Sequence, residues 1–151
     1  MILGKTEASQ TLQLVRELAK PRKLLLVDDD PLYLRMFTLF AADFNCQIDL
    51  ASSYAEAMRK IEEHIDEYEF VWLDMRLNHG KTGFEVYTAI KKRSRLKPVI
   101  LSSAIVPEIE LQAISKMGVA TFVLKPEALT ADFVEELFAC LGISHMKHLR
   151  L

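Results

Sequence analysis

The sequence predicts a single α/β domain built on a doubly wound, five-stranded parallel sheet with helices on both faces. Short apolar runs alternate with longer segments of helical periodicity from about residue 23 to residue 143. Such alternation is typical of parallel strands joined by crossover helices. Three of the runs are apolar throughout, which indicates strands buried on both faces. A length of 151 residues with 50% hydrophobic and 26% charged side chains suits one such domain and excludes a disordered chain.

Each expected strand and helix has its own signal in the sequence, and together these signals give the order of the elements along the chain. The apolar runs expected as strands are residues 23–27, 46–51, 70–73, 98–101 and 121–124. The periodic segments expected as helices are residues 31–43, 54–67, 83–95, 107–117 and 130–141. Asp30, Ser53 and Thr130 are favourable N-caps, and Pro31 suits the first helical position. Glu56, three residues after Ser53, predicts a capping box.

An additional amphipathic helix is expected over residues 7–20, before Pro21, with Leu14 and Leu18 four residues apart on one face. This helix either docks on its own domain or contacts a partner, which includes a homodimer, and the sequence does not choose between the two. We therefore expect an N-terminal helical extension (1–21), a folded domain (22–143) and a C-terminal tail (144–151).

The helix over 31–43 is unusually apolar. One stripe at helical spacing is expected in the core: Tyr33, Met36, Phe37 and Phe40. Three leucines are expected to lie off that stripe: Leu32, Leu34 and Leu39. Three exposed leucines on one short helix predict a patch that another molecule or segment covers.

Polar residues follow four of the five strands at the point where each strand ends. They are Asp28, Asp29, Asp74, Ser103 and Lys125. Because the carboxyl ends of parallel strands meet at one sheet edge, where ligands bind in such sheets, these side chains are expected to converge. Capping of the following helix explains Asp30, but it does not explain Asp28 and Asp29.

Three carboxylates gathered in a crevice stay ionised only beside a compensating cation. Oxygen ligands favour a hard ion such as Mg²⁺, which is commonly held by carboxylates, waters and a substrate phosphate. A divalent cation, the ammonium of Lys125 and the hydroxyl of Ser103 could stabilise a phosphoryl group. A facing carboxylate could then attack phosphorus.

Charge and hydropathy exclude several classes of protein. Nineteen Lys+Arg against 21 Asp+Glu give a net charge of −2, which argues against a nucleic-acid partner. No apolar run approaches the roughly 18 residues of a membrane span, and the first residues are not a secretory signal. Cys46 and Cys140 are expected to be buried free thiols, in keeping with a cytoplasmic location.

Over about residues 22–143 the sequence resembles the receiver domain of two-component response regulators, of the stand-alone chemotaxis-regulator kind. The resemblance lies in LLLVDDDP (24–31), FVWLD (70–74), PVILSSA (98–104) and FVLKP (122–126), in the order and spacing of that family. It implies a flavodoxin-like sheet of order 2-1-3-4-5. It also implies phosphotransfer from a histidine kinase or histidine phosphotransfer protein and an output by contact with a downstream protein.

The resemblance further implies a role for each site residue. Asp74 would be the phosphoacceptor, Mg²⁺ would be held by Asp28, Asp29, Asp74 and the backbone carbonyl of Arg76, and Lys125 would pair with Asp74 and then with phosphate. Ser103 would bond a phosphoryl oxygen and move together with the aromatic switch residue, Phe122. Arg76 and Ile105 occupy positions that tend to set the lifetime of the phosphate. The apolar helix over 31–43 would receive the histidine-containing phosphodonor.

The sequence departs from the family after the phosphoacceptor. Asn78 replaces the usual proline, and Gly83 comes one residue late, so that the loop is one residue longer. An alternative is therefore a receiver-like binding module that is not phosphorylated. Another alternative is a phosphatase of the haloacid-dehalogenase type, because Asp28-x-Asp30 resembles its nucleophile motif. That alternative leaves Asp74 without a role. As a receiver, the protein would be a phosphoacceptor and not a turnover enzyme.

Overall fold

The sheet has five parallel strands in the predicted order, β2-β1-β3-β4-β5. The computed structural model describes residues 5–77, 83–103, 112 and 120–146 of the chain. The strands are β1 (Arg22–Val27), β2 (Cys46–Ala51), β3 (Phe70–Asp74), β4 (Val99–Ser103) and β5 (Ala120–Leu124). Because β1 lies between β2 and β3, the chain changes direction across the sheet at the carboxyl ends of β1 and β3, where ligands bind in such folds.

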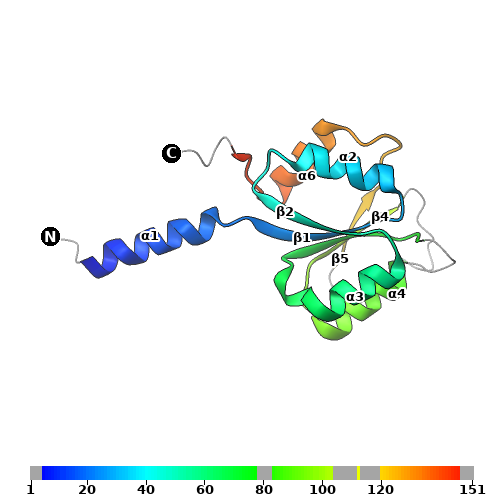
Figure 1. The fold of residues 1–151 in the computed structure, drawn as a ribbon, viewed down its shortest axis with the longest axis horizontal. Helices are drawn as coiled ribbons and strands as arrows, with labels where there is room; N and C mark the ends of the chain where they lie inside the picture. Colours follow the sequence, from blue (N-terminus) through cyan, green and yellow to red (C-terminus); the bar gives the residue numbers. More distant parts are fainter. Residues whose placement is uncertain (1–4, 78–82, 104–111, 113–119, 147–151) are drawn as a thin grey trace.

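Helices cover both faces of the sheet. α2 (Pro31–Ala41) and α6 (Ala131–Cys140) lie on one face, and α3 (Tyr54–His64) and α4 (Gly83–Arg93) on the other (Figure 1). The helix expected over 107–117 lies outside the described residues.

The side chains of β1 show how the sheet divides the core. Leu25 and Val27 pack in a cluster with side chains of α3 and α4, whereas Leu24 and Leu26 pack with side chains of α2 and α6. All four are at most 2% exposed, and burying such a side chain is worth about 1.5–3 kcal/mol. β3 is buried along its whole length, as predicted for a strand covered on both faces.

The three predicted N-caps are formed. The side chains of Asp30, Ser53 and Thr130 each accept a hydrogen bond from a backbone N–H in the first turn of the following helix. The capping box is only half formed, because the Glu56 carboxylate accepts from the N–H and hydroxyl of Ser52, at 3.3 and 3.1 Å.

The expected helix over 54–67 changes character before its end. Its α-helical part ends at His64, and a 3₁₀ turn, η1 (Ile65–Glu67), follows. Such a tightened last turn is common at helix ends. The α2 and α4 helices each end two residues before the boundary that the sequence predicted.

The prediction for Leu34 was wrong, whereas Leu32 and Leu39 are exposed as expected. Leu34 is buried because it lies three residues before Phe37 and seven before Ala41, on the helix face turned to the sheet. Leu32 and Leu39 are each 64% exposed. The apolar patch of α2 therefore consists of two leucines.

The N-terminal helix, α1 (Lys5–Ala19), extends away from the domain at the amino end of β1 (Figure 1). Every side chain described on it, residues 7–16, is exposed. The apolar ones among these include Leu12, Leu14 and Val15. Of the two arrangements that the sequence left open, the structure does not support docking on the helix's own domain.

Two further expectations concern the whole chain. None of the described helices is both long and apolar enough to cross a membrane. Cys46 and Cys140 are both free thiols, as predicted. The expected burial was wrong for Cys140, which is exposed at the end of α6, and holds only in part for Cys46, which is half-buried.

Candidate functional site

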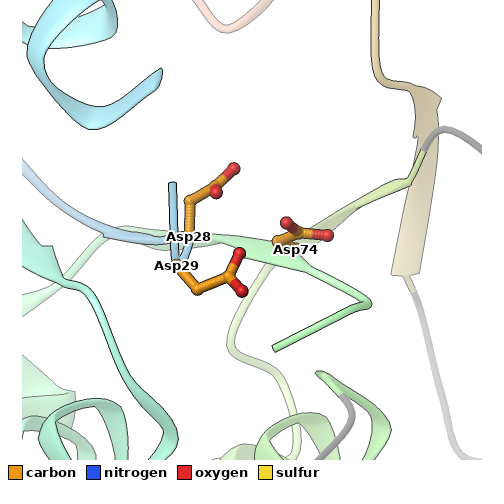
Figure 2. A group of neighbouring side chains, drawn as sticks. All are labelled: Asp28, Asp29 and Asp74. Atoms are coloured by element: carbon orange, nitrogen blue, oxygen red, sulfur yellow. The ribbon is translucent and has the colours of Figure 1, made fainter. Parts of the chain in front are cut away.

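Asp28 and Asp74 are brought together by the register of two neighbouring strands. β1 pairs with β3 so that Val27 lies opposite Leu73; Asp28 directly follows Val27, and Asp74 directly follows Leu73. Asp29 follows directly, so that the three carboxylates gather at the carboxyl edge of the sheet (Figure 2). One oxygen from each lies within 4.8 Å of the others. The predicted convergence of these three residues therefore holds.

Lys125 completes this group from a third strand. It follows β5, and its Nζ lies 2.6 Å from Asp28 Oδ2 and 3.2 Å from Asp74 Oδ2. Its side chain is only 18% exposed. The four residues Asp28, Asp29, Asp74 and Lys125, which we call the carboxyl-edge site, are thus delivered by the ends of β1, β3 and β5.

Backbone groups fix the remaining oxygens of two carboxylates. The N–H of Asp30 donates to Asp28 Oδ1 at 2.9 Å, and the N–H of Arg76 donates to Asp74 Oδ1 at 3.0 Å. Each of these two aspartates therefore has one oxygen held by its own turn and the other by Lys125. The turns after β1 and β3 orient the two carboxylates toward the lysine.

Burial dominates the electrostatics of the site. It raises the pKa of Asp28 to about 6, despite the opposing hydrogen bonds from Lys125 and Asp30 and with a further increase from the charge of Asp74. Burial likewise raises the pKa of Asp74. Burial alone would lower the pKa of Lys125, but its ion pairs with Asp28 and Asp74 raise it. One ammonium thus compensates three carboxylates incompletely, and the site favours an additional positive charge.

The donor set fits a hard divalent cation. All three donors are carboxylate oxygens, which suit Mg²⁺ or Ca²⁺. Two ligands on opposite sides of Mg²⁺ are about 4.2 Å apart, because each Mg–O distance is about 2.0–2.1 Å. Ligands at adjacent corners are only about 2.9 Å apart, and three ligands of one octahedral ion include at least two such pairs. The three oxygens, which lie within 4.8 Å of one another, would therefore have to draw together to share one ion.

Gly83 holds the chain after β3 close to the site. Its N–H donates to the carbonyl of Met75 at 2.8 Å. A Cβ at this position would lie 2.3 Å from the carbonyl oxygen of Asp74 and 2.8 Å from Met75 Cα. Only glycine allows α4 to begin this close to the end of β3.

The structure describes the remaining predicted site residues only in part. The side chain of Arg76 is exposed beside the site. The backbone of Ser103 ends β4, one residue beyond Ser102, which lies opposite Asp74. The side chains of Ser103 and Phe122 lie outside what the structure describes, and so does the whole of Ile105.

One residue near the site escaped the sequence analysis. Tyr33 was predicted as a core residue of α2, and it is buried. Its ring also lies against Lys125, with Nζ 4.2 Å from the ring centroid. Its place in the first turn of the helix that follows the aspartate pair is the signal that could have found it.

Comparison with known proteins agrees with this geometry. Residues 24–135 match the family model described as the response regulator receiver domain. The chain is 31% identical over 107 residues to the transcriptional regulatory protein GlrR of Escherichia coli (strain K12), which covers 71% of the chain and 23% of that relative. The chain therefore spans about a quarter of the length of GlrR.

Two solved structures share the fold. A CheY-like response regulator receiver domain protein from Methanospirillum hungatei JF-1 superposes with a TM-score of 0.69 at 18% identity, over 82% of this chain and 95% of that one. The CheX-CheY-BeF3-Mg+2 complex from Borrelia burgdorferi contains a chain that matches with a TM-score of 0.69 at 24% identity, over 83% and 93% of the two chains.

Proposed function

Because the chain belongs to the response regulator receiver domain family of two-component systems, we propose that Asp74 accepts a phosphoryl group from a histidine kinase or a histidine phosphotransfer protein. The observation that carries this proposal is the meeting of Lys125 Nζ with both Asp28 and Asp74, beside Asp29, at one sheet edge. The protein would act as a phosphoacceptor in the cytoplasm and not as a turnover enzyme.

The proposed transfer uses the site residues as follows. An oxygen of Asp74 attacks phosphorus, the P–N bond of the phosphohistidine breaks as the O–P bond forms, and the proton that the leaving imidazole nitrogen needs comes from its surroundings. Lys125, already 3.2 Å from Asp74, stabilises the negative charge on the phosphoryl oxygens. The Arg76 N–H keeps the attacking carboxylate oriented.

Asp28, Asp29 and Asp74, with the backbone carbonyl of Arg76, would hold Mg²⁺. This ion supplies charge neutralisation for the phosphoryl oxygens when bound. The Borrelia burgdorferi complex that shares this fold is one with BeF3 and Mg²⁺ by its description, which supports the same pairing here. The incomplete charge compensation of the three carboxylates is what would draw the cation in.

Further roles in this proposal come from the family resemblance. Ser103 bonds a phosphoryl oxygen, and Phe122 moves with it to change the surface that a downstream protein reads. Arg76 and Ile105 modulate the lifetime of the aspartyl phosphate. The proposed receiver unit spans residues 22–143, between the helical extension (1–21) and the tail (144–151).

The phosphodonor would dock where α2 begins. A depression of about 310 Å³ lies between the first turns of α2 and the chain after β5, with Leu32, Met36 and Leu129 in its apolar lining. Leu32 projects into solvent at its edge. An apolar depression next to the carboxyl-edge site suits a helix that presents a phosphohistidine.

The N-terminal helix would contact a second copy of the chain. A 15-residue helix in water is marginally stable unless its apolar face is packed. The exposed Leu12, Leu14 and Val15 provide such a face. Sedimentation equilibrium should show a dimer that Leu12→Lys with Val15→Lys converts to a monomer, whereas Gln10→Lys with Gln13→Lys leaves it intact. A monomeric parent protein would exclude this homodimer.

The test of the main proposal is incubation with acetyl phosphate and Mg²⁺. One acid-labile phosphate per chain should appear by mass spectrometry, and Asp74→Asn should abolish it. Persistent labelling of Asp74→Asn would place the nucleophile elsewhere. Turnover of a phosphomonoester that is lost in Asp28→Asn would indicate a phosphatase, and absence of labelling with an intact fold would indicate a binding module.

A further inference from the structure

Tyr33 makes a contact that its place in the core does not require. The Lys125 Nζ lies over the Tyr33 ring, 4.2 Å from its centroid. Tyr33 is only 7% exposed, and Lys125 is 18% exposed at its side chain. An ammonium that is largely withdrawn from water interacts with an aromatic face more strongly than an exposed one does.

The tyrosine hydroxyl does not explain the position of the side chain. It is buried and has no hydrogen-bond partner within the part of the chain that the structure describes. The ring packs beside Phe37, with centroids 6.3 Å apart, so that its plane is fixed from within the core. The ring is the part of Tyr33 that meets the Lys125 ammonium.

The other partners of Lys125 differ from the ring in one respect. Asp28 and Asp74 are both candidate ligands of a divalent cation, and an oxygen that binds a cation is less available to the lysine. The Tyr33 ring is no ligand for Mg²⁺ or Ca²⁺, which take oxygen donors. A bound metal would therefore not compete for the ring as it would for the two carboxylates.

We infer that Tyr33 is a positioning residue whose ring holds the Lys125 ammonium in place to meet the phosphoryl group that arrives at Asp74. This inference rests on the proposed function, since it assigns Lys125 its role toward phosphate. It adds a residue from α2 to a site otherwise built from strand ends.

The first test examines the contact in the metal-free protein. The methylene protons next to Lys125 Nζ should show an upfield ring-current shift in NMR spectra. Tyr33→Phe keeps the ring and should keep this shift, whereas Tyr33→Leu should lose it. A wild-type Lys125 side chain with random-coil methylene shifts would overturn the inference without bearing on phosphotransfer.

The second test examines the role, with beryllofluoride as the phosphoryl analogue at saturating Mg²⁺. Calorimetric titration of Tyr33→Leu should give a Kd about five- to thirty-fold weaker than wild type, as expected for the loss of a partly buried cation–π contact. Tyr33→Phe should stay within about twofold of wild type. The Kd for Mg²⁺ alone should not weaken in either variant, because the ring is not a ligand.

Two controls separate positioning from packing. Phe138→Leu removes a buried ring of α6 that pairs with Phe37 and Phe44, and it should leave the affinity for beryllofluoride near that of wild type. Tyr33→Met, closer in volume to tyrosine, replaces Tyr33→Leu if the latter does not fold. Equal affinities of the Leu (or Met) and Phe variants at position 33 would overturn the inference. So would a loss in Phe138→Leu equal to that in Tyr33→Leu. A wild-type protein that binds no beryllofluoride would end the proposed function itself, and the inference with it.

Discussion

Replacing Asp28 with asparagine should stabilise the metal-free protein at pH 7. Asp28 is fully buried, and burial raises its pKa from an ordinary 3.8 to about 6. The folded protein therefore binds a proton at this site more tightly than the unfolded chain does. Stability from this group is fully present below pH 3.8 and is lost as the pH rises through 6. At pH 7 the ionised carboxylate opposes folding.

The difference between a pKa of 3.8 and one of about 6 corresponds to about 3 kcal/mol of unfolding free energy. The asparagine side chain of the variant keeps the shape of the aspartate and an oxygen that can accept from Lys125, while the buried charge is removed. The variant should thus exceed wild type by up to about 3 kcal/mol at pH 7, or by roughly 6–12 °C in Tm for a domain of this size.

Urea denaturation in EDTA, at pH 7 and again near pH 4, measures this difference. The gap between Asp28→Asn and wild type should shrink toward zero at the lower pH, where Asp28 is protonated. Millimolar Mg²⁺ should stabilise wild type more than the variant, which lacks a ligand. A variant less stable than wild type at pH 7 in EDTA, or a gap that does not change with pH, would refute the reasoning.

Three other changes test neighbouring features by the same urea method. Lys125→Met should lower the unfolding free energy in EDTA by about 3–5 kcal/mol, because the buried carboxylates of Asp28 and Asp74 lose their cation. An unchanged midpoint of urea denaturation would contradict these ion pairs. Gly83→Ala should cost at least about 1–3 kcal/mol, since its Cβ overlaps the Asp74 carbonyl; a neutral effect would show that α4 begins further away. Burial opposes the ionisation of Asp49, but hydrogen bonds from Lys60 and Tyr68 lower its pKa overall. Asp49 therefore stabilises the folded protein above the pKa of the unfolded chain, and this stabilisation is lost as the pH falls through the lowered folded pKa. Asp49→Asn should therefore cost about 1–3 kcal/mol at pH 7 and much less near pH 3, and an equal cost at both would argue against the network.

The placement of the acidic residues could be predicted because it depends on chain direction alone. Once strands are parallel, every residue that follows a strand lies at the same edge of the sheet, whatever the details of packing. Asp28, Asp74 and Lys125 needed no more than this to be brought together. The strand order was harder, and it came from resemblance to a family.

The features that escaped prediction depend on the rotation of a helix about its axis. Leu34 and Tyr33 are adjacent in sequence and about 100° apart on α2, yet both are buried, because the helix sits in the angle between the sheet and α6. Periodicity gave one stripe, whereas the buried face is turned toward Leu34 and Ala41, so that Met36 and Phe40 of the predicted stripe are only half-buried. The contact of Tyr33 with Lys125 depends on that same rotation and on a lysine from the far end of the domain's sequence.

The two ends of β1 connect to different functional features of the molecule. Its six residues span about 20 Å. The α1 helix precedes its amino end (Figure 1), and Asp28 and Asp29 follow its carboxyl end. A partner bound to α1 would therefore lie about one strand length from the proposed phosphodonor. If both proposals hold, the two partners could bind at the same time, and a dimer of the chain could be phosphorylated without dissociating.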